Sequence, residues 1–267
     1  MSPKKWGLCL VILILTACGN TASQFSLPDL VKHVTPSVVI IIGDLITDTE
    51  GPPSNPSSEK KSDIFSIKPS TIHPILRKES ADTEYTKRIV AAGSVQTKDG
   101  FILTVSHAVV GVLNLRALFY DGTTFPLELV ANDGMDAAIV KIKTDKKISF
   151  RPLVVTSAAT LQNGQNVFGI GHPFAFYFST IHGVVSRTFT TENTTKNFGF
   201  PENARDKIIH LDMLFNPGVS GAPIFNMNGE MLAMAFGMIA NANSPGFAFL
   251  AEPIIQYFRS KGVLPMP

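Results

Sequence analysis

The chain has 267 residues, of which 45% are hydrophobic and 16% charged, and its formal net charge is +2. Residues 1–17 contain two lysines and no acid, so 21 of the 23 basic residues remain beyond them, against 21 acidic ones. A neutral chain offers no electrostatic attraction for nucleic acid, so no nucleic-acid partner is expected. Its length is sufficient for a substantial apolar core.

The amino terminus has the pattern of a bacterial export signal. Lys4 and Lys5 precede an apolar run, residues 8–15, that is too short to span a bilayer as an ordinary helix. The end of this run, Leu15-Thr16-Ala17-Cys18, resembles a lipoprotein box, in which the cysteine is lipidated. We predict a lipoprotein signal peptide at 1–17, a lipidated Cys18 and a tether at 18–27, with simple cleavage as the alternative.

Two further expectations follow from this terminus. Gly19, rather than Asp, follows the cysteine. In a host with two membranes, this favours attachment of the protein to the outer membrane, on the side that faces the periplasm. Cys9 lies in the signal and Cys18 would carry lipid, so no thiol remains for a disulfide or a metal. We expect no metal or other cofactor.

Short β-rich runs fill the rest of the chain, and no long helical pattern separates them. We predict an all-β protein with two six-stranded antiparallel β-barrels, the first within 28–150 and the second, with a C-terminal helix, within 151–267. The expected strands are 38–46, 89–96, 101–106, 113–120, 125–131 and 137–142, then 166–171, 177–182 with 184–187, 208–214, 222–225, 230–238 and 246–250. The expected helices are 28–33 and 253–260.

An insertion is predicted at 48–86, between the first two strands. It is rich in Pro, Ser and charged residues, a composition that buries little apolar surface. Loops of this length are usually functional or disordered. A regulatory role and a tolerated surface insertion both stay open.

Three side chains have the types and surroundings of a catalytic triad. His107 ends one apolar run, Asp136 begins another, and Ser220 stands in Asn216-Pro217-Gly218-Val219-Ser220-Gly221-Ala222-Pro223. A serine hydroxyl becomes nucleophilic when a neutral imidazole accepts its proton and a carboxylate orients that imidazole. Small residues around Ser220 allow the backbone N–H groups of Gly218 and Ser220 to form an oxyanion hole.

These motifs resemble the HtrA/DegP family of chymotrypsin-like serine proteases. The similarity includes Thr104 to Val110, Asp133 to Ile142 and Asn216 to Pro223, and extends to Gly169 to Phe174, Gly183 to Ser186, Asn228 to Glu230 and Pro28 to Ile42. It implies an active site in the cleft between the barrels and a serine endopeptidase that cleaves unfolded or exposed envelope polypeptides. It also makes a homotrimer a candidate assembly, whereas the chain ends at Pro267, before the family's PDZ domain.

Three positions depart from the family pattern: His172 and Val219 replace Asn, and Ala222 replaces Gly. None of them removes a triad side chain. His172 is interpreted, like His33, His73, His182 and His210, as a surface or strand residue, because no metal-ligand spacing links these histidines.

The expected specificity pocket is apolar. In trypsin-like enzymes the residue six before the nucleophile forms the pocket floor, which here is Leu214, with Phe215 beside it. Ala235, Phe236 and Gly237 are expected to line the wall. The pocket therefore predicts cleavage after small or medium aliphatic residues.

Two other functions are weighed against this protease. A non-catalytic relative would use the barrel cleft or the insertion as a binding or scaffold module. A glutamyl endopeptidase would need a histidine in the wall strand after the nucleophile, and none follows His210. The catalytic side chains favour the lipid-anchored serine endopeptidase.

Overall fold

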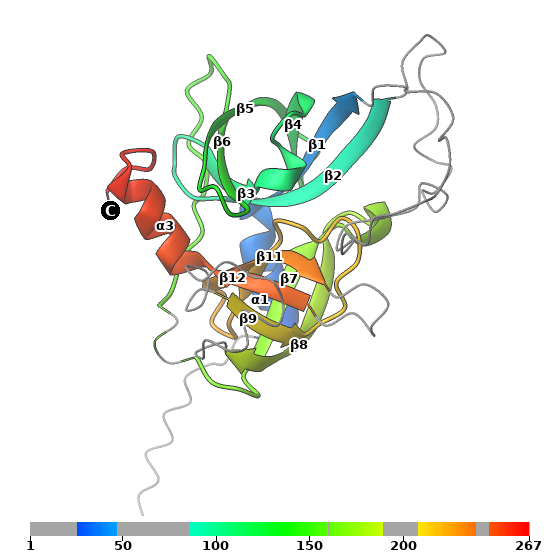
Figure 1. Cartoon of the computed structure of the whole chain (residues 1–267), viewed down its shortest axis with the longest axis vertical. Coiled ribbons are helices and arrows are strands. Elements are labelled where there is room, and N and C mark those ends of the chain that lie inside the picture. The colour runs from blue at the N-terminus through cyan, green and yellow to red at the C-terminus, as the bar shows by residue number, and fades with distance from the viewer. Residues whose placement is uncertain are drawn as a thin grey trace, which may run out of the picture.

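Two closed antiparallel β-barrels make up the protein (Figure 1), as predicted. The computed structural model describes residues 26–46, 86–157, 159, 161–188, 208–238 and 246–266. The signal peptide, Cys18, His73 and nearly all of the predicted insertion lie outside these ranges. Within them, no helix is long and apolar enough to cross a membrane.

The two barrels share one topology. The first barrel closes in the order β1-β2-β3-β6-β5-β4, and the second repeats it as β7-β8-β9-β12-β11-β10. The first contains β1 (Val38–Ile46), β2 (Thr86–Val95), β3 (Phe101–Val105), β4 (Leu113–Phe119), β5 (Thr124–Asn132) and β6 (Ala137–Ile142). The second contains β7 (Asn166–Gly171), β8 (Ser179–Thr188), β9 (Ile208–Asp212), β10 (Pro223–Phe225), β11 (Met231–Met238) and β12 (Gly246–Leu250).

Many strand ends differ from the predicted ones by one or two residues, and two larger differences, in β2 and β8, have a cause in strand pairing. β2 begins at Thr86, the last residue assigned to the insertion, because Thr86 pairs with Ile46 at the end of β1. β8 runs unbroken through Gly183, where two separate segments were expected. A Cβ on Gly183 would lie 1.8 Å from the Asp212 carbonyl oxygen, so glycine there permits the close approach of β9 rather than ending the strand.

Short helices flank the barrels. The helix α1 (Leu27–Val34) begins at Ser26, whose hydroxyl accepts a hydrogen bond from Asp29 N, and buries Leu30 and Val34. The C-terminal helix α3 (Ala251–Ser260) follows β12 directly and begins two residues before Pro253. It packs against β11 and β12 and reaches toward the first barrel in Figure 1.

Apolar side chains fill both barrels and the space between them. In the second barrel the rings of Phe168 and Phe225 stack at 5.1 Å and are fully buried. The same core cluster includes Val39 and Leu103 of the first barrel. Since one cluster contains residues of both barrels, close packing holds them in a fixed relation along the seam where the candidate site lies.

Candidate active site

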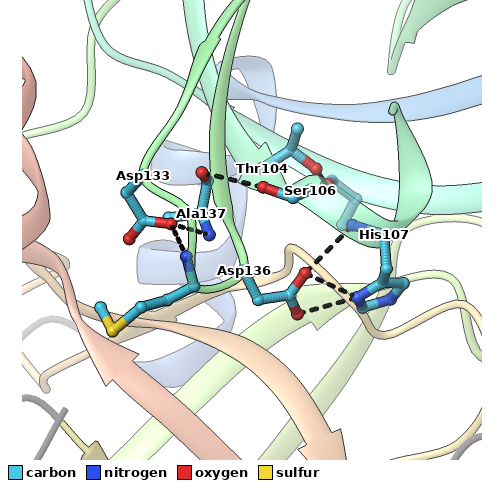
Figure 2. Close-up of polar contacts among 8 residues, drawn as sticks. Thr104, Ser106, His107, Asp133, Asp136 and Ala137 are labelled. Carbon is cyan, nitrogen blue, oxygen red and sulfur yellow. Dashed lines mark hydrogen bonds and ion pairs between the residues drawn. The ribbon is translucent and has the colours of Figure 1, made fainter. Parts of the chain in front are cut away.

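His107 and Asp136 are in direct contact (Figure 2). The imidazole Nδ1 lies 3.0 Å and 2.8 Å from the two carboxylate oxygens of Asp136, and His107 N donates to Oδ1 at 3.0 Å. A carboxylate only accepts hydrogen bonds, so Nδ1 carries the proton in this contact. The other ring nitrogen, Nε2, is therefore the basic one, as a general base requires.

Local backbone contacts hold this pair in place. His107 lies in η4 (Ser106–Ala108), immediately after β3, and Asp136 lies immediately before β6. Ser106 joins them: its N–H donates to the Asp136 carbonyl at 2.8 Å and its hydroxyl to the Ala137 carbonyl at 3.0 Å. The Asp133 carboxylate accepts hydrogen bonds from the N–H groups of Met135 and Ala137, which fixes the turn carrying Asp136.

The turn that carries Ser220 is attached to the first barrel. Ala92 N, on β2, donates to the Ser220 carbonyl at 2.8 Å, and the Ala92 carbonyl accepts the Thr104 hydroxyl at 2.7 Å. Gly221 has φ +81°, and a Cβ there would lie 2.1 Å from the Ala92 oxygen and 2.7 Å from Thr104 Oγ1. Thr104 is three residues before His107, so the serine turn is packed beside the strand that leads to the histidine.

The structure does not join all three triad side chains by hydrogen bonds. Among the described residues, none links the Ser220 hydroxyl to the His107 imidazole. Catalytic hydrogen bonds are often long or misaligned without substrate. The role of Ser220 as the nucleophile stays a prediction, with its backbone fixed through Ala92 beside the strand that leads to His107.

The predicted oxyanion donors are two N–H groups of the serine turn. Pro217 O accepts from Phe174 N at 2.8 Å, and in a trans peptide this directs the Gly218 N–H to the opposite side. Within the described part of the chain, neither Gly218 N nor Ser220 N donates to a carbonyl, whereas Val219, Gly221 and Ala222 all do. These two are the predicted oxyanion donors.

The replacements at Val219 and Ala222 fit the turn. Ala222 is absent from the positive-φ residues, so its Cβ requires no strain, and its side chain is fully buried. Val219 is also buried and lies against Gly171, where a Cβ would be 3.4 Å from the valine Cα. Gly218 and Gly221, with φ of +99° and +81°, are the positions that require glycine.

The interpretation of His172 as a surface or strand residue is wrong. Its side chain is fully buried just beyond the end of β7, with Nε2 3.2 Å from the Val39 carbonyl oxygen and Nδ1 accepting from Phe178 N at 3.0 Å. Burial lowers the pKa of His172 from 6.5 to about 4, outweighing the contact with Val39, which raises it. The only sequence signal was its place inside the Gly169 to Phe174 motif.

The other histidines remain as expected where the structure describes them. His33 is exposed on α1 and contacts the Arg151 guanidinium, and His182 is exposed on β8. His210 lies on β9, and burial is the main cause of its lowered pKa. In the described ranges no group of three His, Cys, Asp or Glu side chains is placed to hold a metal ion.

The predicted pocket residues lie in contrasting surroundings. Leu214 is 66% exposed rather than enclosed, while Phe215 is 3% exposed and its ring lies against Gly246. Ala235 is fully buried, and Phe236 stacks on Phe249 with 3.8 Å between ring centroids. Gly237 has open space on its side-chain face. The apolar pocket built from these residues stays a prediction.

The two six-stranded barrels and the paired histidine and aspartate are those of the chymotrypsin-like serine proteases. Comparison with known proteins gives the family. The trypsin-like peptidase domain family matches residues 91–234, more than half of the chain. The chain therefore belongs to this family, within which its relatives are of the HtrA/DegP type.

Curated relatives include "Probable periplasmic serine endoprotease DegP-like" of Marinomonas sp. (strain MWYL1), 28% identical over 85% of this chain and 48% of the relative. "Protease Do-like 1, chloroplastic" of Arabidopsis thaliana is 33% identical over 54% of this chain and 32% of that protein. The chain thus spans about half the length of such relatives or less. Among solved structures, "HtrA-type protease AlgW with decapeptide" covers 88% of this chain and 67% of its own, with TM-score 0.65 and 19% identity.

The buried His172 predicts an acid-dependent stability. Its pKa of about 4 in the folded protein lies below its ordinary value of 6.5, so between these pH values the unfolded chain binds more protons. The contribution of neutral His172 is complete above pH 6.5 and is lost as the pH falls to 4, a difference of roughly 3 kcal/mol. Urea unfolding from pH 7.5 to 4 should show a smaller loss of stability in His172→Asn than in wild type.

His182→Asn, at an exposed position on β8, is the matched control and should follow the wild-type curve. The comparison also removes the contribution of His210, which changes stability in the same direction in all three proteins. Parallel curves for wild type and His172→Asn would contradict the prediction.

Proposed function

We propose that this protein is a serine endopeptidase in which Ser220, His107 and Asp136 act as nucleophile, general base and orienting carboxylate. The observation that carries the proposal is the His107–Asp136 contact, held at the same seam to which Ala92 and Thr104 fix the Ser220 turn. Membership of the trypsin-like peptidase family and the names of the relatives support it.

The proposed reaction uses each group in turn. His107 Nε2 takes the proton as Ser220 Oγ attacks the scissile carbonyl, and Asp136 stabilises the resulting imidazolium. The N–H groups of Gly218 and Ser220 bind the tetrahedral oxyanion. The imidazolium then protonates the leaving amine, and water, activated by the same histidine, hydrolyses the acyl-enzyme.

The proposed substrates are unfolded or exposed polypeptides of the bacterial envelope. Relatives of the DegP type are named periplasmic serine endoproteases, and the predicted signal would send this chain to the same compartment. The second candidate is a non-catalytic binding or scaffold module. Its support is the replacement of the family's Asn and Gly by Val219 and Ala222 in the serine turn, and activity-based labelling separates the two.

A fluorophosphonate probe should label the wild-type protein covalently, because the probe reacts with an activated serine whose oxyanion donors can bind its phosphoryl oxygen. Ser220→Ala should remove all labelling, whereas Ser260→Ala, at an exposed position on α3, should leave it unchanged. Labelling is measured by in-gel fluorescence and intact mass. A folded wild-type protein that takes up no probe would support the binding module instead.

The apolar residues around the predicted pocket favour cleavage after small or medium aliphatic residues. In a panel of peptides that differ only before the scissile bond, Ala, Val, Ile or Leu should exceed Arg and Glu in kcat/KM by at least about tenfold. Mass spectrometry of the products identifies the cleaved bond. Preference for Arg or Glu would contradict the apolar pocket, and Ser220→Ala controls for contaminating proteases.

We further propose that Cys18 carries lipid and anchors the protein to a membrane, at the outer membrane facing the periplasm in a two-membrane host. The support is the Leu15 to Cys18 pattern followed by Gly19. Metabolic labelling with a fatty-acid analogue should mark wild type and Cys9→Ala, and both should fractionate with membranes. Cys18→Ala should lose the label and the membrane association, and its retention of both would refute the anchor.

A further inference from the structure

The His172 imidazole bridges the two barrels. Phe178 N can only donate, so Nδ1 accepts and the ring proton resides on Nε2, facing the Val39 carbonyl of β1. Both contacts are satisfied by one neutral tautomer. The ring therefore connects a strand of the first barrel to both ends of the segment 172–178 in the second.

The backbone of the same segment holds the serine turn. His172 N donates to Gly218 O at 3.2 Å, and Phe174 N donates to Pro217 O at 2.8 Å. The fit is close, because a Cβ on Gly218 would lie 2.2 Å from the His172 carbonyl oxygen. Residues 172–174 thus bind the carbonyl groups of the two peptides that flank the Gly218 Cα. One of these, the Pro217–Gly218 peptide, carries the Gly218 N–H.

This segment adopts a conformation that needs external support. Phe174, Ala175 and Phe178 have φ of +50°, +63° and +57°, a region that side chains with a Cβ seldom adopt. The His172 ring packs edge-on against Phe178, with 5.1 Å between centroids, and Phe178 packs edge-on against Tyr120 of the first barrel. Removal of the imidazole would leave Phe178 with its contact to Tyr120 but without the ring and the Nδ1 acceptor that tie it to residue 172.

We propose that His172 is a positioning residue of the active site: its ring fixes the segment 172–178 against β1 and thereby directs the Gly218 N–H toward the oxyanion. The inference rests on the proposed peptidase function, because an oxyanion forms only if Ser220 acylates. His172 touches neither substrate nor nucleophile and acts through Phe174 and Pro217.

Two polar substitutions separate the two ring contacts. The oxygen of Asn lies near the place of the histidine Nδ1, so His172→Asn keeps the acceptor for Phe178 N and loses the contact with Val39. The amide nitrogen of Gln lies near the place of Nε2, so His172→Gln keeps the donor to Val39 and loses the acceptor. His172→Ala removes both, and His182→Ala, exposed on β8, is the matched control.

The kinetic test uses a peptide substrate of the enzyme, a peptide aldehyde inhibitor and the product peptide. Loss of one oxyanion donor lowers kcat by roughly 100-fold, and this is the fall expected for His172→Ala, with KM within about threefold of wild type. Affinity for the aldehyde, whose adduct places an oxyanion in the hole, should fall by a similar factor, while product affinity should not. His172→Asn and His172→Gln should lie between, and His182→Ala should equal wild type.

A general structural role would give a different pattern. If His172→Ala lowers stability but leaves kcat and aldehyde affinity unchanged, or weakens product and aldehyde equally, the inference is overturned. Should His172→Ala fail to fold, the Asn and Gln variants provide the same comparison.

A second measurement does not require turnover. A crystal structure of Ser220→Ala with His172 intact should show Pro217 O bonded to Phe174 N, and one of Ser220→Ala that also carries a His172 substitution should show the Pro217–Gly218 peptide rotated. An unchanged peptide would refute the inference even if the enzyme is active. If wild type takes up no fluorophosphonate, the proposed function fails, while this comparison still decides whether His172 orients the turn.

Discussion

The hydrogen bond from Ala92 N to the Ser220 carbonyl is the contact on which the site depends. It joins a strand of the first barrel to the serine turn of the second, and Gly221 allows the approach because it has no Cβ to strike the Ala92 oxygen. That oxygen also accepts the Thr104 hydroxyl, so one residue connects β2, β3 and the turn. Since His107 follows β3 directly, the position of the serine relative to the histidine is set by how the barrels pack.

A polar seam inside an apolar core is stable only if its groups are paired. Thr104 and His172 are both fully buried, and each directs its polar atoms to backbone partners, Thr104 to Ala92 and His172 to Val39 and Phe178. Neither carries charge, because the lowered pKa of His172 keeps its ring neutral at ordinary pH. The seam therefore obtains directional contacts without the desolvation cost of a buried ion. The pair that would bear charge in the proposed reaction, His107 and Asp136, is only partly buried.

The strands and the paired triad residues were predictable because their signals are local. Short β-rich runs between turn residues predicted the twelve strands that the described residues form, and three short motifs predicted His107, Asp136 and Ser220 as the triad. The contacts between distant segments left no such signal. Nothing near Ala92 in the sequence indicates that its N–H binds Ser220, 128 positions later. His172 is likewise surrounded by ordinary strand and turn residues. The continuity of β8 through Gly183 was missed for the same reason, since the neighbour that demands glycine there is Asp212. Cross-barrel contacts depend on packing, which the pattern of one segment does not encode.

Two anchors from the first barrel meet the second barrel side by side. Ala92 binds the Ser220 carbonyl and pairs with Ile40, while Val39 binds the His172 ring and pairs with Gly93. The anchor of Ser220, Ala92, and the anchor of the His172 ring, Val39, thus lie one register position apart on the paired strands β2 and β1. A displacement of this strand pair would carry both anchors together and preserve the relation between Ser220 and Gly218. An asparagine at 172 is too short to reach Val39 while also accepting from Phe178, so the longer imidazole couples the second anchor to the first.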